Sequence, residues 1–92
     1  MAYVICFAKN VIKNDIPAIP AANYDTIMRA IHERLAVAPL DYGKPLRHEL
    51  AGLYSLGVGN WRVGYYIEGN TVIIVHIDPR RDAYKNWKRL LF

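Results

Sequence analysis

Two Gly-Asn pairs, at residues 59–60 and 69–70, constrain the fold of this chain more than any other feature. Each pair separates two runs rich in apolar and aromatic residues, and a glycine in the first central position suits a two-residue hairpin turn. The pairs therefore predict a meander of three antiparallel strands. Because a two-residue turn fixes the pairing, we expect Gly57 opposite Arg62, and Arg62 opposite Ile77.

This register divides the strand residues into two unlike faces, because neighbouring side chains point to opposite sides of a sheet. One face is apolar enough for a core and carries Tyr54, Leu56, Val58, Trp61, Val63, Tyr65, Ile67, Val72, Ile74 and His76. The other is mixed and carries Leu53, Ser55, Gly57, Arg62, Gly64, Tyr66, Ile73, Val75 and Ile77. We expect the first face to pack against helices, with His76 in the core, and the second to form a shallow binding surface.

The N-terminal half predicts one strand and two helices. Residues 2–7 form a short apolar run, and residues 9–16 suit a helix that ends at the prolines that follow, since proline cannot continue the hydrogen-bond ladder. Asn23 can cap a second helix, whose apolar residues recur with helical spacing at positions 24, 27, 28, 31 and 35. Residues 39–45 predict a loop that leads to the strands.

Asp78-Pro79 ends the third strand, and residues 80–92 suit a short helix. We therefore expect an α+β fold with a short N-terminal strand, two helices packed on a small antiparallel sheet, and a short C-terminal helix. A chain of 92 residues, 53% hydrophobic and 22% charged, suffices for one hydrophobic core. Residues 1–92 should form a single domain.

The cysteine content and the N-terminus bear on the compartment. With a single cysteine, Cys6, no disulfide can form within the chain, which is typical of a reducing environment. The first seven residues carry no charge and are too short for the apolar part of a signal peptide. No later apolar run reaches membrane-spanning length. We therefore expect a cytoplasmic protein.

The net charge of +4 lies entirely in the C-terminal half. Through Gly43, four basic residues are balanced by four acidic ones, whereas from Lys44 onward eight basic residues face four acidic ones. Such a concentration of positive charge suits a polyanion or an acidic protein partner. A basic surface that only keeps the protein in solution is the alternative.

Three residues around the end of the third strand form a candidate anion site. By register Arg62 lies on the mixed face close to Arg80, and Tyr84 follows Arg80 by one helical turn. Two guanidinium groups can bind one phosphate, and a tyrosine hydroxyl can transfer a proton beside it. Two alternatives stay open: Arg62 could pair with Glu68 or Asp78, and Tyr84 could simply anchor the C-terminal helix.

A second basic group consists of Lys44, Arg47 and His48. It could follow a nucleic-acid backbone, although an ordinary solvated loop explains it equally well. No histidines, cysteines and carboxylates stand at metal-ligand spacing, and no nucleophile elbow surrounds a serine. The sequence therefore predicts neither a metal site nor a cofactor.

Three segments, in this order, resemble the RelE/ParE toxin superfamily. They are residues 42–47 (Tyr-Gly-Lys-Pro-Leu-Arg), 53–63 (Leu-Tyr-Ser-Leu-Gly-Val-Gly-Asn-Trp-Arg-Val) and 79–84 (Pro-Arg-Arg-Asp-Ala-Tyr). Residues 7–16 resemble the first strand and helix of that family, so the likeness covers almost the whole chain. It implies a RelE-like fold and the toxin of a type II toxin–antitoxin system, held inactive by an antitoxin that wraps it.

The resemblance also implies an activity and a set of site residues. RelE-like members cut mRNA in the ribosomal A site and inhibit translation, through attack of a 2′-hydroxyl on the adjacent phosphate without a metal ion. The family pattern assigns catalysis to Arg62, Arg80 and Tyr84. We expect further substrate contacts from Lys44, Arg47, Arg81 and Lys85. An aliphatic row on the mixed face can accept an amphipathic helix of the antitoxin, and it comprises Ile73, Val75 and Ile77.

Three positions depart from the family pattern. Pro79 stands where a histidine is common, which leaves Tyr84 as the main candidate for proton transfer, and the other two positions keep other functions open. Ser55 stands where the best-known RelE-type nucleases have lysine, and Gly57 stands where many relatives have arginine or lysine. Missing cations weaken the stabilisation of the transition state unless Lys44, Arg47 or Arg81 compensates. The alternatives are a ParE-like poison of DNA gyrase, or a weakened toxin that mainly binds its antitoxin and reaches DNA only through that complex.

Overall fold

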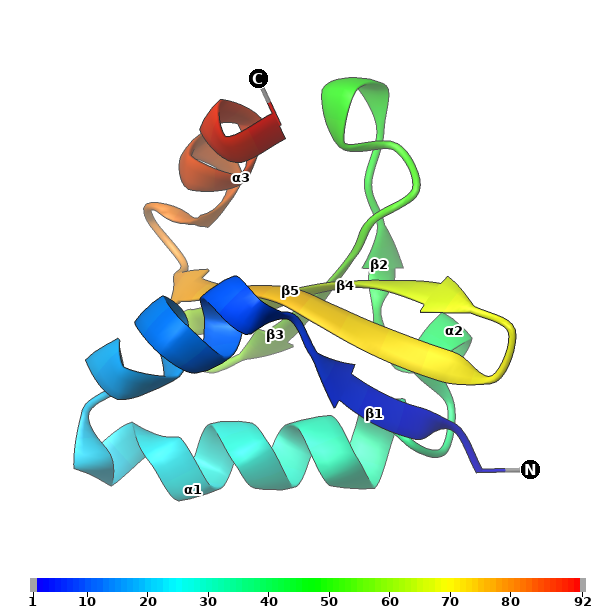
Figure 1. Cartoon of the computed structure of the whole chain (residues 1–92), viewed down its shortest axis with the longest axis horizontal. Coiled ribbons are helices and arrows are strands. Elements are labelled where there is room, and N and C mark those ends of the chain that lie inside the picture. The colour runs from blue at the N-terminus through cyan, green and yellow to red at the C-terminus, as the bar shows by residue number, and fades with distance from the viewer. Residues whose placement is uncertain (1, 92) are drawn as a thin grey trace.

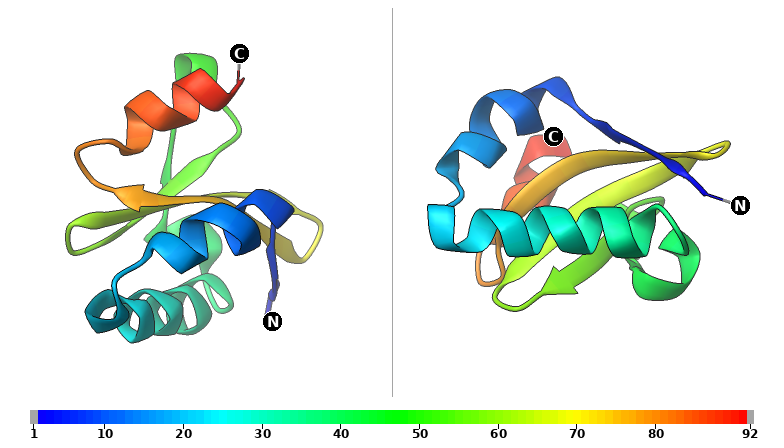
Figure 2. Two further views of the ribbon diagram at one scale, coloured as in Figure 1. Left: turned by 60° about the vertical axis from the view of Figure 1, so that its left-hand side comes forward. Right: turned by 90° about the horizontal axis from the view of Figure 1, so that it is seen from below.

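Five strands form one sheet with helices on both of its faces (Figure 1). The computed structural model describes the backbone of residues 2–91 and the side chains of residues 2–88. The strands are β1 (Val4–Phe7), β2 (Lys44–Pro45), β3 (Tyr54–Val58), β4 (Trp61–Glu68) and β5 (Thr71–Pro79). The helical segments are η1 (Val11–Asp15), η2 (Ile16–Ala18), α1 (Ala21–Ala30), η3 (Ile31–Leu35), α2 (Pro39–Tyr42), η4 (His48–Leu50) and α3 (Ala83–Leu91). Figure 2 shows α1 beneath the sheet and α3 above it, which confirms the expected α+β fold.

The strand order β1-β5-β4-β3-β2 contains the expected meander and adds one strand at each edge. β1 pairs with β5 in parallel, so the sheet is mixed rather than wholly antiparallel. At the other edge β2 pairs antiparallel with β3, where the sequence predicted a loop. Two residues are too few to show the alternation by which a strand is recognised in a sequence.

Both Gly-Asn turns have the predicted form. Gly59 has a φ of 57° and Gly69 a φ of 62°, in the left-handed region that glycine adopts without steric cost. In the first hairpin Gly57 pairs with Arg62, as the turn predicts.

A β-bulge in the second hairpin corrects the rest of the predicted register. The pairing of β4 with β5 shifts by one residue next to Gly64, and Val75 is left without a partner. Beyond this extra residue the two faces of β5 exchange. Arg62 consequently pairs with Asp78, and the prediction that it pairs with Ile77 is wrong.

The bulge moves two side chains to faces opposite to those expected. Ile77 enters the core beside α1 and is only 2% exposed, so it cannot belong to an exposed antitoxin-binding row with Ile73 and Val75. His76 is buried as expected, but on the other face, where its ring stacks on Trp87 of α3 with centroids 5.2 Å apart.

The N-terminal helices follow the prediction except at their ends. α1 begins at Ala21 directly after Pro20, so Asn23 lies inside the first turn and is not the cap. The helix continues through η3, and its buried stripe packs on the sheet with Ile27, Ile31 and Leu35. Among the described residues, no helix is long and apolar enough to cross a membrane.

A second, smaller core lies on the opposite face and holds α3 against the segment between β2 and β3, visible beside α3 in Figure 2. Its members are Leu50, Ala83 and Trp87, with Leu46 and Leu53 packed against them. Lys88 Nζ lies 3.5 Å from Glu49 Oε2 across the same contact. Because α3 has only nine residues, this packing and not helix propensity keeps it in place.

The segment before β2 approaches the sheet so closely that only glycine fits. Tyr65 of β4 is fully buried, and its hydroxyl donates a hydrogen bond to the carbonyl of Pro39. A Cβ at Gly43 would lie 1.7 Å from that hydroxyl oxygen. A side chain at position 43 therefore has to displace the tyrosine or the β2 edge of the sheet.

Gly43→Ala is expected to lower the free energy of unfolding by about 2–4 kcal/mol, through overpacking and loss of the Tyr65 hydrogen bond. Chemical denaturation measures the change. Tyr65→Phe loses the hydrogen bond without the clash and should cost about 1–2 kcal/mol. If Gly43→Ala costs no more than Tyr65→Phe, the close contact described here is wrong.

Candidate functional site

Tyr84 brings the C-terminal helix into contact with the third strand. Its hydroxyl donates a hydrogen bond to the Oγ of Ser55 at 3.3 Å, and Ser55 itself is buried. The Tyr84 ring meets Trp87 edge-on with centroids 5.4 Å apart, yet the residue stays 41% exposed. Tyr84 therefore anchors α3 and also remains open to solvent, so the two roles expected for it do not exclude each other.

The guanidinium group of Arg62 lies across Gly57 on the neighbouring strand. A Cβ at Gly57 would be 3.2 Å from Arg62 Nη1, so the absence of a side chain there makes room for it. Nη1 donates hydrogen bonds to the carbonyls of Gly59 at 2.9 Å and Trp61 at 2.7 Å. Within the described part of the chain no carboxylate forms an ion pair with Arg62, so neither acidic partner considered for it is observed.

These contacts place several predicted site residues along one strip of the sheet. Ser55 and Gly57 point to the same face of β3 and are about 7 Å apart. Lys44 pairs with Ser55 across β2 and β3, and opposed residues of antiparallel strands share a face. We call the strip the β3 surface and define it by Lys44, Ser55, Gly57, Arg62 and Tyr84. It carries two cationic side chains and two hydroxyl groups.

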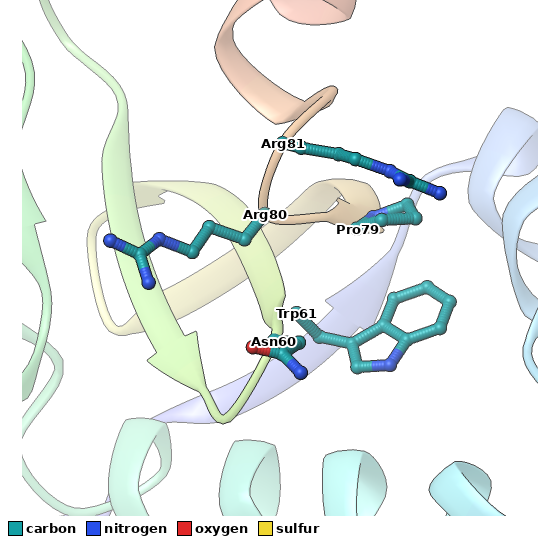
Figure 3. A pocket seen from close by; sticks show the side chains of 5 residues that line it. All are labelled: Asn60, Trp61, Pro79, Arg80 and Arg81. Carbon is teal, nitrogen blue, oxygen red and sulfur yellow. The ribbon is translucent and has the colours of Figure 1, made fainter.

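Arg80 and Arg81 leave the end of β5 in opposite directions (Figure 3). The backbone N–H of Arg80 donates to the Asn60 carbonyl at 2.7 Å, which fixes both residues beside the first hairpin turn. Arg81 points to the same side as the Trp61 indole and Pro79. The Arg80 guanidinium points away from them. A pocket of about 470 Å³ is lined by Asn60, Trp61, Pro79, Arg80 and Arg81. The guanidinium groups of the two arginines thus point to different sides of the hairpin end that also holds Arg62, although both residues line the pocket.

The other predicted contact residues lie farther from the β3 surface. Arg47 directly precedes η4, and Lys85 follows Tyr84 on α3. Both are exposed, and no described contact joins either one to the β3 surface. Their role in binding a substrate stays a prediction.

Trp87 connects the β3 surface to a polar group that the sequence did not indicate. It is fully buried, and its Nε1 donates to Asp78 Oδ2 at 2.8 Å. Its ring lies between His76 and Gly64, where an added Cβ would approach it to 3.0 Å. Burial lowers the pKa of the His76 imidazole, with the charge of Asp78 opposing the shift. A glycine inside a strand was the available signal, since it often marks a bulge or a close contact.

Comparison with known proteins identifies the family. The model of a family described as the ParE toxin of the type II toxin–antitoxin system parDE matches residues 8–84. Toxin RelG of Mycobacterium tuberculosis (strain ATCC 25618 / H37Rv) is 34% identical over 87 residues, covering 92% of this chain and 99% of that protein. The chain belongs to the RelE/ParE toxin superfamily. The resemblance seen in the three sequence segments is confirmed, and the chain is the toxin of a type II system.

Solved structures show the same fold. A chain of the RelBE2 toxin–antitoxin complex from Mycobacterium tuberculosis aligns with a TM-score of 0.78 and 31% identity, covering 87% of this chain and 100% of that chain. The isolated RelE toxin of E. coli aligns with a TM-score of 0.69 over 99% of this chain and 100% of that chain. At 14% identity, the second likeness concerns the fold alone.

Gly64→Ala is expected to lower the free energy of unfolding by about 1–3 kcal/mol, because the ring of Trp87 is held by His76 and Asp78 and cannot yield to a methyl group. Denaturation monitored by tryptophan fluorescence reports both the stability and the environment of the ring. Gly57→Ala is the matched control. The added methyl group there meets only the flexible end of Arg62, so a similar loss in both variants would contradict the described seat of Trp87.

Proposed function

We propose that this toxin is a nuclease that cuts mRNA on the ribosome and thereby inhibits translation. The β3 surface carries the proposal, because it sets the Tyr84 hydroxyl, Arg62 and Lys44 along one strip of sheet. Two relatives support it by their names. Toxin RelG is similar over nearly its whole length, and 49 residues are 43% identical to Toxin RelE of the same organism, covering 51% of this chain and 50% of that protein.

The proposed reaction needs proton transfer and stabilisation of negative charge. The 2′-oxygen of the RNA loses its proton and bonds to phosphorus, and the bond to the 5′-oxygen breaks as that oxygen takes up a proton. Tyr84 is the candidate proton donor or acceptor, because its hydroxyl is oriented by the hydrogen bond to Ser55 while the residue remains 41% exposed. The guanidinium groups of Arg62 and Arg80 suit the charge that builds on the phosphoryl oxygens.

Lys44 offers the positive charge that Ser55 does not. It is exposed on β2, pairs with Ser55, and shares its face of the sheet. A flexible lysine on a neighbouring strand can therefore occupy much of the space that a lysine at position 55 would use. Arg47, Arg81 and Lys85 then contact more distant phosphates of the mRNA, which the basic C-terminal half attracts over longer range.

A cognate antitoxin is the proposed protein partner. The similar solved structures include RelE–RelB complexes from Pyrococcus horikoshii and Methanococcus jannaschii as well as the mycobacterial complex. Ile73 and Val75 are partly exposed and can contribute to such an interface, whereas Ile77 cannot. Ribosomes and mRNA as targets imply action in the cytoplasm, with DNA contacted only through the antitoxin complex.

Poisoning of DNA gyrase is the second candidate. The matched family is described by the name of the ParE toxin, and Ser55 and Gly57 leave the β3 surface with fewer cations than an efficient nuclease would carry. A toxin that acts by binding needs no proton transfer from Tyr84. The two functions therefore differ in what they require of that hydroxyl.

Expression of the toxin without an antitoxin should arrest translation with codon-phased cuts in mRNA, and Arg62→Ala and Tyr84→Phe should each slow cleavage on programmed ribosomes at least about 100-fold. Arg34→Ala removes an exposed arginine on the opposite side of the sheet and should cut like the wild type. Intact mRNA together with stalled gyrase–DNA complexes would establish the gyrase function instead.

Gly57→Lys is expected to speed cleavage at least about tenfold, because it adds a cation beside the phosphate that Arg62 contacts. The position is exposed, and only the end of the Arg62 side chain has to move to admit the new residue. Single-turnover cleavage on ribosomes measures the effect, with Gly57→Ala as the neutral control. An unchanged rate would show that charge at position 57 does not limit the reaction.

A further inference from the structure

A polar cluster with no part in the proposed cleavage lies where η1 meets the end of β5. Asp15 of η1 and His76 and Asp78 of β5 each contribute one oxygen or nitrogen atom, and these three atoms lie within 4.8 Å of one another. Asp15 lies 61 residues before His76, and His76 and Asp78 alone are only two potential ligands, so the sequence does not indicate a set of three. Only the fold brings them together.

The edge of β5 explains why Asp15 is there. β1 pairs with β5 only as far as Ile74, so the following backbone groups need other partners. Asn10 Nδ2 donates to the Val75 carbonyl at 3.1 Å, and the Ile77 N–H donates to Asp15 Oδ2 at 3.1 Å. Two side chains near η1 thus replace the missing strand and bring a carboxylate beside His76.

The groups of this cluster lack a counter-cation. His76 is 7% exposed, and its Nδ1 is buried without a hydrogen-bond partner. Among the described residues no lysine or arginine forms an ion pair with either carboxylate. Two close carboxylates and a buried, unpartnered imidazole are costly to hold without a positive charge between them.

We propose that Asp15, His76 and Asp78 bind one divalent transition-metal ion, for which zinc is the best match. One imidazole nitrogen and two carboxylate oxygens suit zinc, with water completing the coordination, whereas magnesium and calcium prefer oxygen ligands alone. Two ligands that are each about 2.1 Å from a zinc ion are at most about 4.2 Å apart, so a pair at the 4.8 Å limit of this cluster would have to close by about 0.6 Å or more on binding. Half-buried carboxylates at a helix and a strand end can make such a shift.

The bound ion would act as a structural clamp. It would tie η1 to β5 directly and reach α3 through Trp87, which stacks on His76 and donates to Asp78. Because α3 carries Tyr84, the ion would also steady the seat of that hydroxyl over Ser55. The site takes no part in the cleavage chemistry, and its existence does not depend on the proposed nuclease function.

Calorimetric titration of the full-length, tag-free, chelator-treated toxin with zinc chloride tests the proposal. The Cys6→Ser background removes the exposed thiol as a competing ligand. We expect one zinc ion per chain with micromolar or tighter affinity, weakened at least tenfold by Asp15→Asn and by His76→Gln. His32→Gln and Asp25→Asn remove exposed groups elsewhere and should bind like the wild type. Absent saturable binding, or binding that Asp15→Asn leaves unchanged, would overturn the site.

A second readout separates a clamp from ordinary surface binding, and it also covers the case in which His76→Gln fails to fold. In a Trp61→Phe variant, Trp87 is the remaining tryptophan, and zinc should shift its fluorescence and raise the melting temperature by an amount that grows with zinc concentration. Asp15→Asn should abolish both effects, and magnesium should produce neither. Zinc binding without any change at Trp87 would overturn the clamp.

Discussion

The packing of Trp87 against β4 and β5 is the contact that holds α3 on its face of the sheet. The indole is fully buried and is held by a stacked imidazole, a carboxylate and a strand position without a side chain. A buried tryptophan removes roughly 150–250 Å² from water, about 4–6 kcal/mol by area, which is large for a helix of nine residues. Without this packing α3 would lose most of the free energy that stabilises it as a helix, and Tyr84 would not be held beside Ser55.

The same contact shows where prediction of the fold from the sequence succeeds and fails. The two Gly-Asn turns were predictable because a glycine with positive φ in a hairpin is a local requirement. The bulge beside Gly64 was not, because nothing local marks it, and the side chain that packs on Gly64 is Trp87, 23 residues further along the chain. One shifted residue then reversed the faces of His76 and Ile77. Local turn chemistry sets where strands begin, whereas tertiary packing decides which way their ends face.

The candidate site shows the same difference between features that local sequence determines and features that tertiary packing determines. The grouping of Arg62 with Tyr84 followed from hairpin register and helical spacing, and the structure places both on the β3 surface. The position of Lys44 beside Ser55 depends on the pairing of a two-residue strand, and so short a strand gives no periodic pattern in the sequence. The opposite directions of the Arg80 and Arg81 side chains could not be predicted either, because side chains do not alternate regularly beyond the end of a strand. The residues of the site could therefore be predicted from the sequence. The directions of their side chains could be predicted only where a helix or strand fixes them.

The position of Arg62 has a consequence for how an RNA would be bound. In the free toxin its Nη1 already donates to two backbone carbonyls, and the absence of a side chain at Gly57 leaves room for that arrangement. Moving toward a phosphate would exchange neutral acceptors for a charged one, which makes shorter and stronger hydrogen bonds. The carbonyls of Gly59 and Trp61 lie at a turn, where water can replace the lost donor at little cost. The phosphate itself would then complete the site, by drawing Arg62 away from the two carbonyls.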